Sequence, residues 1–271
     1  MATAHTAHWI AVDWGTSNLR VWAMEGSAVI ARAQGPHGMA GLTRAQFGPT
    51  LEALMADWTL APDTPAIACG MVGARQGWTE APYRALPCTP QDSALITVPD
   101  SPRPVHIIPG LKQTTPPDVM RGEETQIAGF LALNPGWDGV ICLPGTHSKW
   151  VHVSAGEVIS FQTFMTGELF ALLAEHSVLR HSLAGDGMEV AAFDEALAET
   201  LSRPEKLAAR LFAIRAGDLL EGAQAALSRA RLSSALIGAE LAAAKPYWLG
   251  QQLAIIGADA QSALYARALQ S

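Results

Sequence analysis

The fold is decided by residues 9–22, Trp-Ile-Ala-Val-Asp-Trp-Gly-Thr-Ser-Asn-Leu-Arg-Val-Trp. An apolar run ends at an aspartate, the chain turns through small polar residues, and a second apolar run follows. This pattern predicts a β-hairpin whose turn can approach a ligand closely, because the turn begins with a glycine. Its hydroxyl and amide groups suit phosphate oxygens, and a carboxylate at the strand end suits a Mg²⁺ ion held through water. The candidate phosphate-binding residues are Gly15, Thr16, Ser17 and Asn18, and the candidate metal ligand is Asp13. An ordinary tight hairpin with a capping aspartate is the alternative interpretation.

A second stretch of the same design lies at residues 138–153. A buried-type strand runs into Gly-Thr-His-Ser, and a basic residue and another strand follow. Two such hairpins in the two halves of one chain predict duplicated domains that face each other over one nucleotide. This organisation resembles the superfamily of sugar kinases, heat-shock proteins and actin. No acidic residue stands at the place that matches Asp13, so the second hairpin is expected to bind phosphate without metal. Its candidate residues are Gly145, Thr146, His147 and Lys149.

Size and composition exclude several classes of protein. The 271 residues suffice for one large domain or two modest ones, and 49% hydrophobic with 16% charged residues describe a globular chain. A net charge of −7 argues against non-specific nucleic-acid binding, which needs a basic surface. No apolar run is long enough to span a bilayer, and the N-terminus lacks the pattern of a secretory signal. The cysteines at 69, 88 and 142 have no metal-ligand spacing. We expect a cytoplasmic protein without nucleic-acid or membrane partners, and a homodimer is left open.

The first half of the chain predicts a β-meander followed by α/β units. A third strand is expected at 27–33, a helix at 43–58 with Thr43 as its N-cap, and buried strands at 65–69 and 104–110. Residues 78–101 are rich in Pro and turn residues, which predicts an inserted or active-site loop. Three antiparallel strands, a helix and further parallel strands follow the order of a ribonuclease-H-like domain.

The second half repeats the meander and then becomes helical. A helix at 122–133 is expected to cross into the second domain. The expected strands are 139–143, 148–153, 157–161 and 253–256, and the expected helices are 167–176, 188–201, 204–213, 218–230, 233–244 and one from residue 259. We therefore predict an α/β fold of two ribonuclease-H-like (actin-like ATPase) domains, at 1–121 and 122–271, facing an interdomain cleft.

Four further segments, at 70–78, 81–83, 119–126 and 164–169, are too polar or Gly-rich for scaffolding alone. In chain order, the motifs are Asp-Trp-Gly-Thr-Ser-Asn-Leu-Arg, Gly-Met-Val-Gly, Ala-Pro-Tyr, Met-Arg-Gly-Glu-Glu-Thr-Gln, Pro-Gly-Thr-His-Ser-Lys-Trp and Met-Thr-Gly-Glu-Leu. From residue 9 to 257 this set resembles the 2-dehydro-3-deoxygalactonokinase family. The resemblance implies that ATP, with Mg²⁺, phosphorylates the C6 hydroxyl of 2-keto-3-deoxygalactonate in galactose or galactonate breakdown.

The sequence departs from the family pattern at two places. Residues 74–76 read Ala-Arg-Gln, where small or neutral polar residues are usual, so sugar contacts there are expected to differ. Family members continue beyond the position of Ser271 with another strand and helix, which the second domain is therefore expected to lack.

Phosphoryl transfer needs a group that orients the attacking hydroxyl, and the superfamily often places a carboxylate at the crossover helix. Glu123 or Glu124 is the candidate general base, and we favour Glu123 because it follows Gly122 at the very start of the helix. The alternative is that both are first-turn acids favoured by the helix dipole. Arg20 is expected to pair with a structural carboxylate.

The substrate carboxylate and keto group need hydrogen-bond donors, and aromatic rings can pack against one face of a sugar. The candidate substrate-binding residues are Arg75, Trp78, Tyr83 and Arg121, and Lys149 is a candidate for substrate or phosphate. The two aromatic residues can equally be side chains that only fill the hydrophobic core. Gly238 with Glu240, and Gly257 after the late strand, are the candidate nucleoside contacts.

Two other functions fit parts of the pattern. An exopolyphosphatase-like hydrolase would use the Gly-Glu-Glu segment to orient water, and a non-catalytic sugar-sensing or actin-like assembly protein would keep the fold without turnover. The sequence does not separate galactonate from gluconate derivatives, which differ at one stereocentre.

Overall fold

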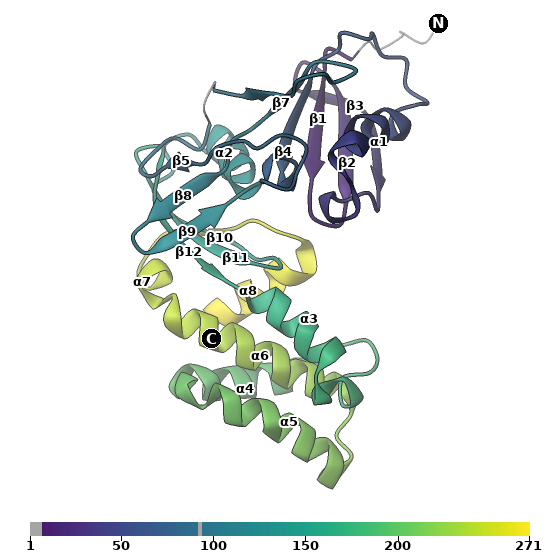
Figure 1. Ribbon diagram of the computed structural model, residues 1–271. Helices are drawn as coiled ribbons and strands as arrows, with labels where there is room; N and C mark the ends of the chain where they lie inside the picture. Colours follow the sequence, from purple (N-terminus) through teal and green to yellow (C-terminus); the bar gives the residue numbers. More distant parts are fainter. Residues whose placement is uncertain (1–6, 92–93) are drawn as a thin grey trace, which may run out of the picture. The chain divides into compact units, whose positions relative to one another are not determined.

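The computed structural model describes residues 7–91 and 94–271, and the chain forms two compact units (Figure 1). The first unit comprises the residues up to 136 together with 156–158, and the second comprises 137–155 and 159–271. The division falls after Gly136, so the helix that was expected to cross into the second domain belongs to the first unit.

The first unit is built on a mixed six-stranded sheet in the order β3-β2-β1-β4-β7-β6. Its strands are β1 (Trp9–Trp14), β2 (Leu19–Glu25), β3 (Ala28–Gly35), β4 (Ala66–Gly70), β6 (Ile96–Thr97) and β7 (Val105–Ile107). The first three strands form the predicted antiparallel meander, and β1, β4 and β7 run parallel. Pairing sets Asp13 opposite Arg20 on β2 and opposite Cys69 on β4.

A second, three-stranded sheet was not foreseen from the sequence. It consists of β5 (Arg84–Ala85), β8 (Leu111–Thr114) and β9 (Pro117–Met120). The stretch predicted as a loop at 78–101 contains β5 of this sheet and β6 of the six-stranded sheet. The sequence of β8 and β9 is short, polar and interrupted by two prolines, so it lacks the apolar alternation that indicates a strand. The hairpin leads directly into α2 (Glu123–Leu133), whose predicted bounds are confirmed within one residue.

The core of the first unit lies between the sheet and the segments that cover it. Trp14 is fully buried, and its ring contacts those of Phe47 and Trp78 with centroid distances of 4.9 and 6.0 Å. Phe47 begins α1 (Phe47–Leu54), which follows a 3₁₀ turn at Arg44–Gln46. Thr43 caps that turn in a reciprocal box with Gln46, as expected of its residue type. The helix predicted for 43–58 is therefore shorter and divided.

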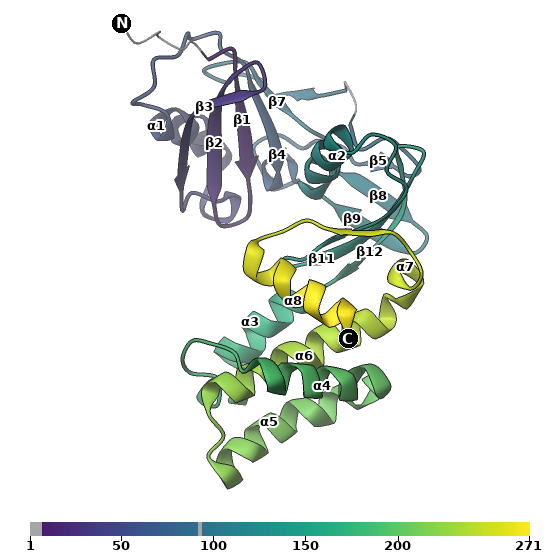
Figure 2. The same cartoon turned by 180° about the vertical axis from the view of Figure 1, so that it is seen from behind.

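The second unit joins a four-stranded sheet to a layer of helices (Figures 1 and 2). The sheet order is β12-β11-β10-β13, with β10 antiparallel to β11 and parallel to β13. The strands are β10 (Gly139–Leu143), β11 (Ser148–Ser154), β12 (Glu157–Phe164) and β13 (Leu253–Ile255). The helices are α3 (Thr166–His176), α4 (Val190–Ser202), α5 (Leu207–Glu221), α6 (Ala225–Ala243), α7 (Lys245–Trp248) and α8 (Asp259–Gln270).

The helix α6 is the centre of this layer and packs against α3, α4, α5 and α8. The prediction of separate helices at 218–230 and 233–244 was wrong. The first break falls at Gly222, where α5 ends, and α6 then continues without interruption to Ala243. Gly222 adopts the left-handed conformation at φ 67°, a usual way for a helix to end. Because α6 is buried on several sides, its apolar residues do not form the single stripe that would have marked one helix.

Gly238 lies where α6 packs tightly against α4. A Cβ on this residue would lie 2.9 Å from the Cβ of Thr200 and 3.3 Å from Cδ1 of Leu197. Helix packing therefore explains why a glycine stands at position 238, and the predicted nucleoside contact is not needed to account for it.

We expect Gly238→Ala to lower the free energy of unfolding, because forcing α4 and α6 apart costs about 1–3 kcal/mol and exceeds the helix propensity that alanine gains. Urea unfolding measures the change. Gly129→Ala on α2 is the matched control, since the added Cβ meets no atom within 4 Å beyond its chain neighbours and its own helix backbone. That variant should gain about 0.5–1 kcal/mol. Equal gains in both variants would contradict the close approach of α4 and α6.

Candidate active site

The ends of β1 and β4 and the start of α2 meet in the first unit through two glycines. Gly70 has φ 91° and Gly122 has φ 109°, a region that side-chain-bearing residues rarely adopt. A Cβ on Gly122 would lie 3.3 Å from the Cα of Gly70, and one on Gly70 would lie 2.7 Å from the carbonyl oxygen of Trp14. This close backbone contact sets the first turn of α2 beside the strand end that carries Asp13.

Glu124, in that first turn, is completely buried. Its carboxylate accepts the backbone N–H of Gly122 at 2.7 Å and the hydroxyl of Thr125 at 3.1 Å. Burial raises the pKa of Glu124 to about 7, against the lowering effect of the Gly122 N–H. Burial also raises the pKa of the neighbouring Cys69 thiol, and the carboxylates of Asp13 and Glu124 add to that shift. Cys69 is therefore a neutral thiol between two acids.

Glu123, the other acid of the predicted pair, lies differently. Its side chain is half-buried, and its carboxylate accepts the backbone N–H of Arg121 at 3.0 Å. The two neighbouring acids thus have separate environments, one enclosed and one accessible. Both also stand at a helix N-terminus, where negative charge is favoured.

Asp13 is paired with Arg20, whose Nη1 donates to Oδ2 at 2.9 Å. The carboxylate that Arg20 was expected to find is therefore the candidate metal ligand itself. Within residues 7–91 and 94–271, no three His, Cys, Asp or Glu side chains are grouped to hold a metal ion. Mg²⁺ is commonly bound by one or two carboxylates together with substrate phosphates and water. The donor set here, a half-exposed carboxylate beside a phosphate-type turn, fits that mode of binding.

The first hairpin turn is braced from behind by residues 38–40. The carbonyl oxygens of Gly15, Thr16 and Ser17 accept the N–H groups of Met39, Ala40 and Gly38 at 3.0–3.1 Å. The N–H of Gly15 donates to the carbonyl of Asn18 at 2.9 Å, whereas the side chains of residues 16–18 are exposed. The turn is thus held by its carbonyl groups, which leaves its side chains available to a ligand.

Arg121 is the basic group closest in sequence to these acids. Its guanidinium lies 4.2 Å from the centroid of the Tyr83 ring, and its Nη2 donates to the carbonyl of Ala81 at 2.8 Å. Nε and Nη1 are enclosed, and neither has a hydrogen-bond partner in the part of the chain that the structure describes. A Cβ on Gly73 would lie 2.8 Å from Nη1, so this glycine makes room for the guanidinium. Enclosed cationic donors without partners are costly unless a ligand satisfies them.

The other predicted substrate residues are placed less favourably. Arg75 has a side chain 81% exposed, with Nε 3.7 Å from Oε1 of Glu80. Trp78 stacks on Phe47 at a centroid distance of 5.8 Å, which matches the alternative that this side chain fills the core. Tyr83 is the aromatic residue of this group that lies against Arg121.

The second hairpin turn rests on the start of α3. The carbonyl of Thr146 accepts the N–H of Glu168 at 2.9 Å, and Nε2 of His147 lies 2.5 Å from Oε2 of Glu168. A Cβ on Gly167 would collide with the carbonyl of Gly145, so only glycine allows this contact. Lys149 is 4% exposed, and its Nζ donates to the carbonyl of His147 at 3.5 Å. Its ammonium group is therefore turned inward in this structure.

Next to that turn lies a cavity of about 230 Å³. Its wall combines Gly145 and Gly167 with apolar groups of α3, α6 and α8, and with the polar side chains of Arg229 and Gln261. Arg229 stacks over Phe170 at 5.4 Å from the ring centroid. Gly238 and Gly257 do not line the cavity, and a Cβ on Gly257 would instead meet the carbonyl of Pro144 at 3.3 Å.

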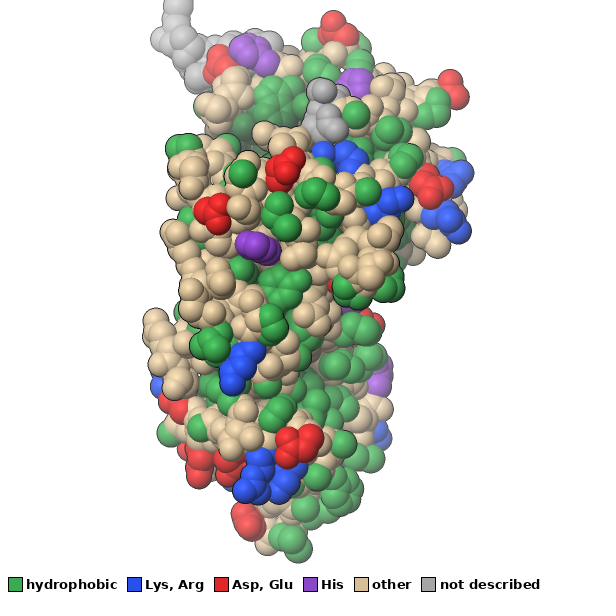
Figure 3. Space-filling model, turned by 90° about the vertical axis from the view of Figure 1, so that its left-hand side faces the viewer, with side chains coloured by type: hydrophobic (Ala, Val, Ile, Leu, Met, Phe, Trp, Pro, Cys, Tyr) green, Lys and Arg blue, Asp and Glu red, His purple; other side chains and the backbone are tan. Residues whose placement is uncertain are grey.

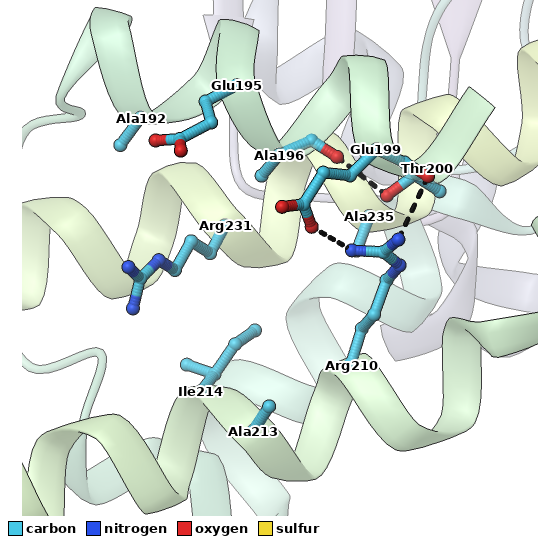
Figure 4. A pocket seen from close by; sticks show the side chains of 10 residues that line it. All are labelled: Ala192, Glu195, Ala196, Glu199, Thr200, Arg210, Ala213, Ile214, Arg231 and Ala235. Carbon is cyan, nitrogen blue, oxygen red and sulfur yellow. Dashed lines mark hydrogen bonds and ion pairs between the residues drawn. The ribbon is translucent and has the colours of Figure 1, made fainter. Parts of the chain in front are cut away.

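A second cavity of about 210 Å³ lies among α4, α5 and α6 (Figure 4). Alanine side chains at 192, 196, 213 and 235 leave this space between the helices, and Glu199 pairs with Arg210 beside it.

Charged and hydrophobic side chains are interspersed on the face of the second unit seen in Figure 3. No helix in the described residues is long and apolar enough to cross a bilayer.

Comparison with known proteins identifies this combination of fold and motifs. Residues 13–271 match the model of the 2-keto-3-deoxy-galactonokinase family. A Rhizobium meliloti (strain 1021) protein named as a probable 2-dehydro-3-deoxygalactonokinase is 41% identical, covering 100% of this chain and 91% of that protein. The Escherichia coli (strain K12) 2-dehydro-3-deoxygalactonokinase is 35% identical, covering 98% and 90%.

Solved structures agree. A crystal structure from Sinorhizobium meliloti that carries the same kinase name has a TM-score of 0.90 at 40% identity, covering 97% of this chain and 90% of that one. Component A of the Acidaminococcus fermentans (R)-2-hydroxyglutaryl-CoA dehydratase has a TM-score of 0.53 at 12% identity, covering 97% and 87%. The predicted α/β, actin-like fold class is confirmed by these likenesses.

The raised pKa of Glu124 makes stability depend on pH. Because the folded protein binds this proton more tightly than the unfolded chain, the group's contribution is fully present below its ordinary pKa of 4.5 and is lost as the pH rises to about 7. The loss is at most about 3 kcal/mol. Glu124→Gln should remove it, so urea unfolding should show the variant gaining on the wild type between pH 5 and pH 8. The same difference at both pH values would mean that Glu124 is not held protonated by burial.

Proposed function

This chain belongs to the 2-keto-3-deoxy-galactonokinase family, and we propose that it transfers the γ-phosphoryl group of ATP to the C6 hydroxyl of 2-keto-3-deoxygalactonate. The family is one of kinases, so ATP is its phosphoryl donor. The observation that carries the sugar-acid part of the proposal is the enclosed guanidinium of Arg121 with its two unpartnered N–H groups. None of the comparisons supports a phosphohydrolase or a non-catalytic sensor.

Each unit carries one turn that is proposed to bind phosphate, and a cavity lies beside the turn of the second unit. We infer that the turns at 15–18 and 145–147 each contact phosphate oxygens, the first with exposed hydroxyl and amide side chains and the second beside the N-terminus of α3. Asp13 would hold Mg²⁺, which neutralises charge on the transferring phosphate. The cavity lined by Phe170, Arg229 and Tyr265 would take the nucleoside, in place of Gly238 and Gly257. That both turns contact one nucleotide stays a prediction.

The sugar acid is assigned to Arg121. A carboxylate placed against Nε or Nη1 would form a charge-assisted hydrogen bond, and the ring of Tyr83 lies 4.2 Å from the guanidinium. Of the two predicted arginines, Arg75 is exposed beside Glu80, so it offers no enclosed donor. Residues of the Gly70–Gly73 segment shape this site, because Gly73 leaves the space that the guanidinium occupies.

Glu123 is assigned as the base that orients the attacking hydroxyl. A carboxylic acid with a pKa near 7, such as Glu124, also suits proton transfer. Yet Glu124 is fully enclosed, whereas Glu123, whose carboxylate accepts the N–H of Arg121, is only half-buried. We therefore infer that Glu124 holds the first turn of α2 and that Glu123 faces the sugar.

A coupled assay with ATP across a panel of 2-keto-3-deoxy sugar acids and their neutral counterparts tests the substrate assignment. Arg121→Gln should raise KM for the acids about 10–100-fold, the value of a lost charge-assisted pair, and leave KM for ATP unchanged. Arg75→Gln is the comparison variant. A larger rise in Arg75→Gln would move the carboxylate site there, and turnover of the neutral sugars alone would overturn the substrate class.

The two acids are separated by their glutamine variants. Glu123→Gln should lower kcat about 10²–10⁴-fold with KM for ATP nearly unchanged, because general-base assistance is worth that much. Glu124→Gln should retain most of kcat. A large loss of kcat in Glu124→Gln with a mild Glu123→Gln would exchange the two roles, and two mild variants would place the base elsewhere.

A further inference from the structure

Glu240 is an acidic residue buried in the last turn of α6, which ends at Ala243. It is 3% exposed and adjoins a core cluster that includes Cys142, Trp150, Leu241 and Tyr265. Oε1 accepts the indole N–H of Trp150 at 2.8 Å. Oε2 accepts the hydroxyls of Ser148 at 2.8 Å, of Tyr265 at 2.7 Å, and of Thr166.

All four of these donors are neutral groups, so the carboxylate is held by hydrogen bonds to uncharged partners. Burial raises the pKa of the Tyr265 hydroxyl, and the Glu240 carboxylate adds to that shift, so this hydroxyl stays a donor. Removing a carboxylate from water is expensive, and an apolar side chain of similar size is often as good for stability. Core packing alone therefore gives no reason for a glutamate at this position.

The four donors belong to separate elements that surround the second turn. Ser148 and Trp150 lie on β11 directly after the turn, Thr166 begins α3, and Tyr265 lies on α8. Ser148 is completely buried, and its hydroxyl is already used as a donor to Glu240. Thr166 is followed by Gly167 and Glu168, whose backbone rests on Gly145 and Thr146. One carboxylate thus joins both ends of the contact between the turn and α3.

The same carboxylate reaches the wall of the cavity next to the turn. Thr166 and Tyr265, which donate to Glu240, line the cavity together with Gly145. A shift of either side chain would change the cavity and the turn together.

We propose that Glu240 is a positioning residue for nucleotide binding, which sets the turn at 145–148, the first turn of α3 and the wall of the cavity in one arrangement. This inference rests on the proposed function, since it assigns the nucleotide to that turn and cavity. Glu240 acts through Ser148 and Thr166 and does not touch the ligand. It replaces the sequence-based expectation that Glu240 and Gly238 contact the nucleoside directly.

Calorimetric titration of the full chain with MgADP tests this without using the kinase reaction. Glu240→Gln offers an N–H₂ group where the hydroxyls or the indole need an acceptor, so the network cannot form completely. The dissociation constant for ADP should rise about tenfold or more, since small displacements of a binding group have large effects. KM for the sugar acid should stay within twofold of the wild type, about the error of such assays.

Two further variants separate a loss of the Glu240 network from general destabilisation. Leu232→Ala empties a fully buried position two turns earlier on α6 and should lower Tm without changing ADP affinity. Ser148→Ala leaves the carboxylate and removes one donor, so it should weaken ADP binding in the same direction. The double variant with Glu240→Gln should show less than the sum of the two effects, because both act on one network.

The outcomes separate the inference from the proposed function. Unchanged ADP affinity in Glu240→Gln, an equal weakening in Leu232→Ala, or strictly additive effects in the double variant would each overturn the positioning role. If Glu240→Gln does not fold, unchanged ADP affinity in Ser148→Ala overturns it. Failure of the wild type to bind ADP would overturn the proposed function itself.

Discussion

The close approach of Gly70 and Gly122 is the constraint on which the first unit's site depends. The end of β4 and the residue before α2 come together with positive φ at both glycines, and no Cβ fits comfortably between them. This contact brings the first turn of α2 to the strand ends where Asp13 and Cys69 pair. It thereby buries Glu124, leaves Glu123 accessible and turns the preceding Arg121 toward Tyr83. A side chain at either glycine would separate the acids from the strand end.

Buried ionisable side chains are the second common feature, and we infer that they mark the parts of the fold that serve a ligand. The first unit encloses Glu124 and the guanidinium of Arg121, and the second encloses Glu240. Each costs desolvation energy that an apolar residue would avoid. Glu124 and Glu240 are satisfied within the protein by neutral donors, which makes them supports of the backbone around a turn or helix start. Nε and Nη1 of Arg121 are not satisfied within the described residues, which is why we propose that this group receives an anion.

Much of this could be predicted from the sequence, where local pattern and local structure coincide. Both hairpins, the meander and α2 follow from apolar runs that end in Gly-Thr turns or at capping residues. The parts that failed depend on tertiary context. The polar, proline-containing β8–β9 hairpin has no apolar alternation, and the unbroken α6 has no single apolar stripe. Trp78 joins the core because Trp14 and Phe47 meet it in space, and the Asp13–Arg20 pair arises from cross-strand register. The network around Glu240 joins residues up to 92 positions apart, which no local motif encodes.

An experimental structure with ADP, Mg²⁺ and 2-keto-3-deoxygalactonate bound is the most direct test of the central claim, that enclosed Arg121 receives the sugar acid beside Glu123. The account predicts the sugar-acid carboxylate within hydrogen-bond distance, about 2.7–2.9 Å, of Nε or Nη1 of Arg121, with the C6 hydroxyl directed to Glu123. A sugar acid bound elsewhere, with those two N–H groups still enclosed and unpartnered, would contradict it.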